Sequence, residues 1–77
     1  MEPEAREIVL DVCGLQPPEP MEQIMSALGT LEHGWHLRVI IDRQPFPLYS
    51  ILERSGYEHS TRAFDAHRFE IRIWRNA

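Results

Sequence analysis

The chain of 77 residues has no lysine, a single cysteine and no long apolar segment. One cysteine, Cys13, cannot form an internal disulfide, which is consistent with a reducing compartment. No apolar run approaches the ~20 residues that a membrane span requires. The acidic start, MEPEAREIV, also lacks the basic and apolar regions of a signal peptide. We therefore expect a cytoplasmic protein with no membrane partner.

The charge is distributed unevenly along the chain. The net charge is −4, and all eight basic residues are arginine. Residues 1–34 contain seven acidic residues and one arginine, whereas residues 35–77 contain five acidic residues and seven arginines. A nucleic-acid-binding domain usually has a stronger basic excess. The arginines of the second half alternate with acidic residues, as on a solvated sheet face, so nucleic acid is not an expected partner.

Apolar periodicity predicts two strands and two helices in the first three quarters of the chain. Alternating apolar residues predict strands over Glu7–Val12 and Trp35–Asp42. Prolines occur at the expected start of each helix. Proline is tolerated in a first turn because the backbone N–H that it lacks would have no partner there. The first helix has apolar residues at three- and four-residue spacing, namely Met21, Ile24, Met25, Leu28 and Leu31. The second has Phe46, Leu48, Tyr49, Ile51 and Leu52, and ends at Gly56.

The last quarter of the chain is predicted to form a β-hairpin over residues 57–75. A three-residue loop, 65–67, would place Phe69, Ile71 and Ile73 on the same face as the alternate residues of the first hairpin strand. That face would contain Tyr57, His59, Thr61, Ala63, Phe69, Ile71 and Ile73. A two-residue loop would instead pair Phe69, Ile71 and Ile73 with Glu58, Ser60 and Arg62, because a slip of one residue reverses the face, so the longer loop is favoured.

The element order is therefore βαβαββ, and residues 1–77 are expected to form a single domain. Right-handed crossovers place both helices on one side of the sheet. The expected fold is an α+β two-layer sandwich, with a mixed four-stranded sheet and two helices on one face.

The second face of the predicted sheet has no covering layer. Its members are Val9, Arg38, Ile40, Glu70, Arg72 and Trp74. Ordinary surface apolarity accounts for such a face. It is also a candidate pairing surface, with Val9, Arg38, Ile40, Arg72 and Trp74 as interface residues of a homodimer. Both interpretations remain open.

Two separated motifs resemble known bacterial families. LDVCGLQPPEP (10–20) is similar to the opening signature of the TusA/SirA-like sulfur carriers, and the matching residues are Asp11, Gly14, Leu15, Pro18 and Pro20. The nearer resemblance is to the DUF2249 family, through this motif, DRQPFPLY (42–49), the later GY (56–57) and IRIWR (71–75). The resemblance covers nearly the whole chain. It implies a βαβαββ fold shared with the sulfur carriers and with the C-terminal domain of a bacterial translation initiation factor.

Two departures from the sulfur-carrier pattern affect the expected chemistry. Pro17 occupies the position of the reactive cysteine, and Cys13 replaces the arginine of the motif. The resemblance therefore implies a domain without the sulfur relay, and we predict no enzymatic activity. A thiol-transfer role for Cys13 is the alternative, although a lone cysteine beside an apolar strand is more often a small buried hydrophobe.

The histidines do not predict a metal site. A site needs three or four converging ligands, and no pair among His33, His36, His59 and His67 has the helical spacing that forces convergence. We expect no metal and no cofactor. His59 lies on the predicted helix-covered face and is expected to be partly buried with a hydrogen-bond partner.

The carboxyl ends of the first two strands form the predicted binding site. Asp11 and Asp42 terminate these strands, and parallel neighbours would bring both carboxylates to the edge where ligands bind open α/β sheets. The other candidates are Gln16, Pro17, Pro18, Glu19 and Arg43. Aspartate at a strand end also commonly caps a turn, and this alternative remains open.

The sequence as a whole predicts a small non-enzymatic binding or protein-interaction module. Its recognition edge would be formed by GLQPPEP and DRQPFPLY. The DUF2249 resemblance implies a redox or nitrogen-oxide setting, by analogy. The alternatives are a sulfur or thiol-transfer protein that uses Cys13, and an RNA-binding domain, which the fold relative and the Arg-rich second half suggest. The sequence does not identify the partner.

Overall fold

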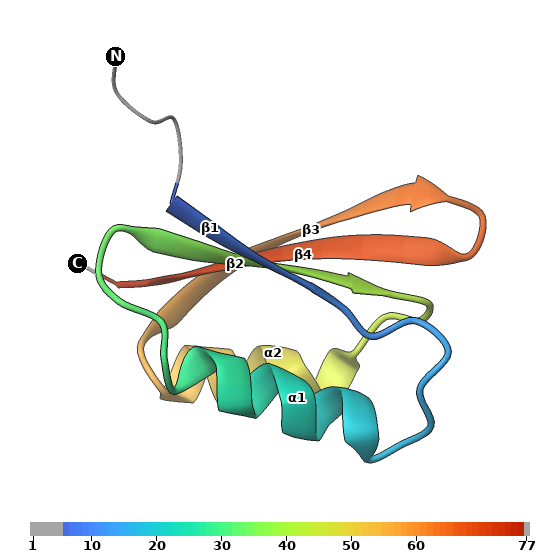
Figure 1. The fold of residues 1–77 in the computed structure, drawn as a ribbon, viewed down its shortest axis with the longest axis horizontal. Coiled ribbons are helices and arrows are strands. Elements are labelled where there is room, and N and C mark those ends of the chain that lie inside the picture. Colours follow the sequence, from blue (N-terminus) through green and yellow to red (C-terminus); the bar gives the residue numbers. More distant parts are fainter. Residues whose placement is uncertain (1–5, 77) are drawn as a thin grey trace.

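The computed structural model describes residues 6–76, which form four strands and two helices. In chain order these are β1 (Arg6–Asp11), α1 (Glu19–Leu28), β2 (Trp35–Ile41), α2 (Phe46–Arg54), β3 (Tyr57–Asp65) and β4 (Arg68–Arg75). The strands are arranged β1-β2-β4-β3, with β1 parallel to β2 and the other pairs antiparallel. Both helices cover the same face of the sheet (Figure 1). The predicted two-layer α+β sandwich is confirmed. Residues 1–5, the first part of the acidic start, and residue 77 lie outside the described part.

Proline fixes the start of both helices. α1 begins at Glu19, follows Pro17 and Pro18, and has Pro20 in its first turn. α2 begins at Phe46 with Pro47 next to it. The fixed φ of proline suits the first turn, and its missing N–H costs nothing there. The first predicted strand is shifted by one residue, because β1 covers Arg6–Asp11 instead of Glu7–Val12, and β2 ends one residue before the predicted Asp42.

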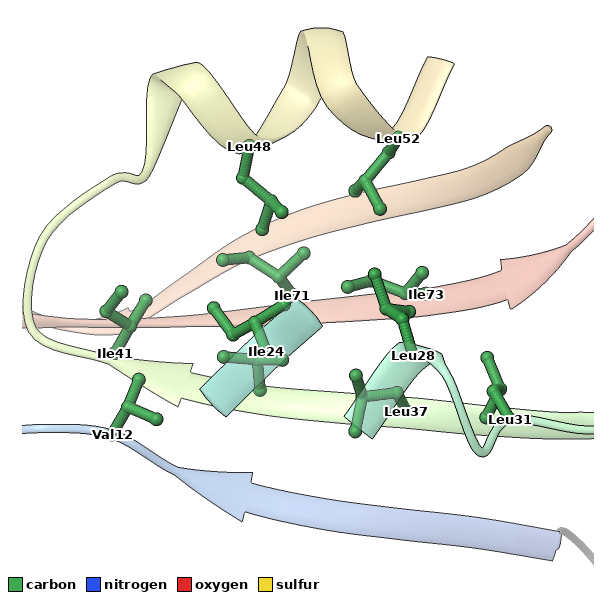
Figure 2. Close-up of a cluster of buried hydrophobic side chains, with 11 residues drawn as sticks. Val12, Ile24, Leu28, Leu31, Leu37, Ile41, Leu48, Leu52, Ile71 and Ile73 are labelled. Atoms are coloured by element: carbon green, nitrogen blue, oxygen red, sulfur yellow. The ribbon is translucent and has the colours of Figure 1, made fainter. Parts of the chain in front are cut away.

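The core lies between the helices and the sheet. Leu48 and Leu52 point from α2 toward Ile71 and Ile73 of β4, as Figure 2 shows. Burial of such side chains stabilises a fold by about 1.5–3 kcal/mol each. The complete cluster contains Val12, Ile24, Leu28, Leu31, Leu37, Val39, Ile41, Leu48, Leu52, Ile71 and Ile73.

The hairpin has the predicted faces but not the predicted loop. Thr61 pairs with Ile71 and Ala63 with Phe69, so the apolar set shares one face as expected. The turn, however, contains two residues, Ala66 and His67, rather than three. A β-bulge between Ala63 and Asp65 explains the difference, because the extra residue in β3 restores the register that a shorter turn would have shifted.

Within residues 6–76, neither helix is long and apolar enough to cross a bilayer.

Candidate functional site: a proline-lined pocket between two loops

The loops that follow β1 and β2 meet at one end of the molecule. β1 and β2 are parallel, so the segments that follow them leave the sheet at the same edge (Figure 1). The Asp11 carboxylate accepts a hydrogen bond from the backbone N–H of Cys13 (3.0 Å). The Asp42 carboxylate accepts one from the N–H of Gly14 (3.0 Å). Both carboxylates therefore hold the turn after β1, which is the capping role that aspartate often has at strand ends.

Glycine is required in that turn. Gly14 has φ +81°, in the left-handed region that side chains with a Cβ disfavour. Its N–H points to a residue 28 positions away in the sequence. The turn is thereby held in place by the loop after β2, and the two proline motifs form one structural unit.

An apolar pocket of about 190 Å³ lies between the two motifs. Five of its lining residues are prolines, Pro17, Pro18, Pro20, Pro45 and Pro47. Met21, Ile24 and Ile41 complete the apolar wall, and Asp42, Arg43 and Gln44 provide the polar atoms. Arg43 Nε is 3.9 Å from Asp42 Oδ1, so the charged part of the rim is an ion pair. We call this the proline pocket.

The structure brings together part of the predicted binding set. Pro17, Pro18, Asp42 and Arg43 line the proline pocket, and Asp11 supports it through the Cys13 turn. Gln16 and Glu19 do not line the pocket. The N–H of Glu19 donates to the carbonyl oxygen of Gln16 (2.9 Å), in the turn that starts α1.

Several lining residues were not among the predicted site residues. The helical spacing of Met21 and Ile24 predicts only an amphipathic helix, whereas Pro45 and Pro47 belong to DRQPFPLY, which is part of the expected recognition edge. The proline cluster at the start of each helix is the sequence signal for this pocket. Because each cluster follows one of two parallel strands, both clusters lie at the same edge of the sheet.

A second hollow, of about 260 Å³, lies between α1 and α2. It is lined by Met25, Leu28 and Gly29 from the α1 side, and by Ile51, Leu52, Ser55 and Tyr57 from the α2 side. Met25 is one helical turn from Met21, about 6 Å along the axis of α1. The proline pocket and this second hollow therefore follow one another along the helix pair.

Cys13 lies within the turn that Asp11 holds, and it is half-buried. Burial raises the pKa of its thiol, and the carboxylates of Asp11 and Asp42 raise it further. A raised pKa keeps the sulfur protonated, whereas nucleophilic sulfur chemistry requires the thiolate. This environment is the reverse of the electropositive one that activates cysteine.

Tyr49 connects the second proline motif to β3. Its ring stacks on His59 with centroids 4.9 Å apart, and its hydroxyl lies 2.9 Å from Thr61 Oγ1 and 3.4 Å from Gln44 Oε1. His59 is partly buried, as predicted. Among residues 6–76 its side chain has no hydrogen-bond partner, however, because Nε2 is 3.7 Å from Glu53 Oε2 and Nδ1 is buried without a partner. The stack with Tyr49 takes the place of the expected hydrogen bond.

The uncovered face of the sheet is more charged than apolar. Val9 is exposed, and Ile40 and Trp74 are half-buried. Glu70 is only 5% exposed, because Arg38 (3.0 Å) and Arg62 (2.8 Å) both bind its carboxylate. The hypothesis that this face pairs two copies of the chain remains a prediction.

Across residues 6–76, no group of three or more His, Cys, Asp or Glu residues is arranged to hold a metal ion.

The comparisons with known proteins agree with the two motifs. A family model described as an uncharacterized conserved protein (DUF2249) matches residues 9–75, a span that includes both proline motifs. No curated protein and no solved structure matches the chain. Because the family model covers most of the sequence, the chain belongs to the DUF2249 family.

Proposed function

We propose that this chain is a non-enzymatic protein-interaction module that binds an apolar side chain of a partner protein in the proline pocket. The observation that carries the proposal is the wall of five prolines, contributed by two motifs far apart in the sequence. Proline has almost no rotamer entropy to lose on burial. A preformed wall of this kind therefore binds an apolar group at a low entropic cost.

The size of the pocket favours a single side chain over a metabolite. Sites for cofactors and drug-sized molecules are usually about 300–1,000 Å³, whereas the proline pocket is about 190 Å³. Single apolar anchors in a central pocket commonly dominate protein interfaces. The second hollow, farther along α1 and α2, would receive a neighbouring residue of the same partner segment. Met21 and Met25 are suited to this role because methionine adapts its shape to different contacts.

The cytoplasmic setting that we propose rests on the acidic start and the single cysteine, and the rest of the proposed context rests on resemblance. The first motif is similar to that of the TusA/SirA-like sulfur carriers, but Pro17 stands where their reactive cysteine would be. We infer that the loop retains a role in partner recognition without sulfur transfer. A redox or nitrogen-oxide context is the one that the DUF2249 resemblance suggests. The raised pKa of Cys13 disfavours the alternative of thiol transfer through that residue.

Selection from a library of random peptides displayed on phage tests the proposal. We expect the selected peptides to share an apolar or aromatic residue, and Met21→Glu to weaken their binding at least tenfold. Gln23→Glu is the matched control, because it places the same charge on an exposed position of the same helix. Circular dichroism would verify that both variants fold. Equal binding by Met21→Glu and the unaltered protein would refute the proposal.

A further inference from the structure

Two arginines oppose each other on the uncovered face of the sheet. Arg38 of β2 and Arg72 of β4 are direct cross-strand partners in an antiparallel pair. Like charges in this arrangement destabilise a sheet. The charge of Arg38 is balanced by two carboxylates, since its guanidinium lies 3.0 Å from the carboxylate of Glu70 and 3.6 Å from that of Glu7. Arg72 belongs to none of the ion pairs found in residues 6–76.

Glu70, two residues before Arg72 on β4, is already bound by two arginines. Oε2 of Glu70 binds Arg38 Nη1, and its Oε1 binds Arg62 Nη2. These bonds hold the pKa of Glu70 below its usual range, so that the carboxylate stays ionised near neutral pH. Glu70 thus fixes the positions of Arg38 and Arg62, and Arg72 has no carboxylate oxygen left to bind there.

A hollow of about 230 Å³ lies beside Arg72. It is lined by Ser60, Arg62, Glu70 and Arg72. Ser60 is the cross-strand partner of Arg72, and Arg62 is the partner of Glu70, so the four residues form two adjacent rows of the β3–β4 pair. Arg62 uses Nη2 for Glu70, which leaves further guanidinium N–H groups. The hollow therefore presents arginine donors and a hydroxyl, and one carboxylate whose oxygens are both engaged.

We propose that this hollow binds a phosphate-class oxyanion, held by Arg72 and Arg62 with Ser60 as an additional donor. The planar fork of a guanidinium matches two oxygens of such an anion. The bound charge would also relieve the repulsion between Arg38 and Arg72. This site lies on the sheet face opposite the helices and is independent of the proline pocket.

The surrounding charges favour a single oxyanion over a nucleic-acid strand. The carboxylates of Glu7, Glu58 and Glu70 alternate with the arginines across the face, and the whole chain has a net charge of −4. A strand of RNA would bring successive phosphates against these acidic groups, whereas one anion in the hollow meets mainly arginine.

Titration with inorganic phosphate, followed by NMR of backbone amides and arginine side chains, tests the proposal. Chloride would keep the ionic strength constant. We expect saturable shifts at Ser60, Arg62 and Arg72. Binding should weaken at least tenfold in Arg72→Gln and severalfold in Ser60→Ala. Arg54→Gln should bind like the unaltered protein, because Arg54 is an exposed arginine on α2, in the other layer.

A second arm with phenyl phosphate identifies the source of the oxyanion. Tighter binding than with inorganic phosphate indicates that the group belongs to a larger ligand, and equal binding indicates a free ion. The proposal fails if phosphate causes no saturable shift, or if Arg72→Gln binds it unchanged. It also fails if an oligouridine binds while phosphate does not, or if sedimentation shows a stable dimer that buries Arg72.

Discussion

The backbone N–H of Gly14 donates a hydrogen bond to Oδ2 of Asp42, and this bond joins the two proline motifs across 28 positions of sequence. It spans the same edge of the sheet as the proline pocket, which has Asp42 in its wall. The shape of the pocket therefore depends on a contact between one backbone group and one side chain.

Asp42→Ala should loosen this edge. The substitution removes the acceptor of the Gly14 N–H, and a hydrogen bond of this kind contributes about 0.5–1.5 kcal/mol to the free energy of unfolding. Urea denaturation would measure the loss, and hydrogen exchange at the Gly14 amide would localise it. Asp42→Asn keeps a carbonyl acceptor and should cost less. Equal losses for the two variants would show that the charge of Asp42, rather than its hydrogen bond, is what matters.

Glu70 should make the stability of the protein sensitive to acid. Its hydrogen bond with Arg38, followed by that with Arg62, holds its pKa below the usual range in the folded protein. The unfolded chain, with an ordinary glutamate pKa of about 4.3, then binds the proton more readily. The stabilisation is therefore complete above that ordinary pKa and is lost as the pH falls through the lower folded value.

Urea unfolding over a pH series would test this dependence. Glu70→Gln should lower stability at neutral pH by about 2 kcal/mol, since bonds to charged groups contribute about 1.5–3 kcal/mol. The substitution should also weaken the decrease in the free energy of unfolding at acidic pH, which we call the acid limb of the pH profile. Asp65 also has a lowered pKa, through its hydrogen bond with Arg68, and titrates in the same direction. Asp65→Asn is therefore the control, and an acid limb that survives in Glu70→Gln but disappears in Asp65→Asn would contradict the prediction.

Arg72→Gln should stabilise the protein when no oxyanion is present. Removing one of two directly opposed arginines relieves a repulsion of up to about 1 kcal/mol. Salt screens exposed charges, so the gain should be largest at low ionic strength and should shrink as sodium chloride is added. Thermal unfolding at several salt concentrations would measure it. A loss of stability at low salt would mean that Arg72 makes a net favourable contribution on this face.

Cys13 should react slowly with alkylating reagents. Burial and the carboxylates of Asp11 and Asp42 raise the pKa of the thiol, which lowers the thiolate fraction at neutral pH. Asp11→Asn should accelerate alkylation by iodoacetamide, because the amide oxygen can still accept from the Cys13 N–H while the charge is removed. Mass spectrometry after treatment with a persulfide donor gives a second measurement. A gain of one sulfur atom that is lost in Cys13→Ser would support thiol transfer instead.

The faces of the strands could be predicted from the sequence because side chains alternate with period two. That rule placed Thr61 opposite the apolar residues of β4 and Arg38 on the uncovered face. It did not reveal the bulge between Ala63 and Asp65, since a bulge with a shorter turn gives the same face pattern as a longer turn.

The candidate site was only partly predictable, because it depends on side chains rather than on periodicity. The two strand-end aspartates were expected to lie at one edge, and they do. Capping of a turn by these aspartates was one of the two expected interpretations, but spacing does not indicate that Asp42 would reach the Gly14 amide of the other loop. Glu70 illustrates the same limit, because its position predicts an exposed residue, whereas the two arginines that bind it cover it.

The position of β1 at the edge of the sheet has a consequence for the order in which the fold opens. β1 and β3 are both edge strands and are each held by a single ladder, but the β1–β2 ladder has six residue pairs and the β3–β4 ladder has eight. Local opening of a protein begins where the fewest bonds must break. Detaching β1 would carry the 12–18 turn away from the Asp42 loop and divide the proline pocket, while β2, β4 and β3 and the hollow beside Arg72 stayed paired. The two proposed sites would thus be lost at different stages of unfolding.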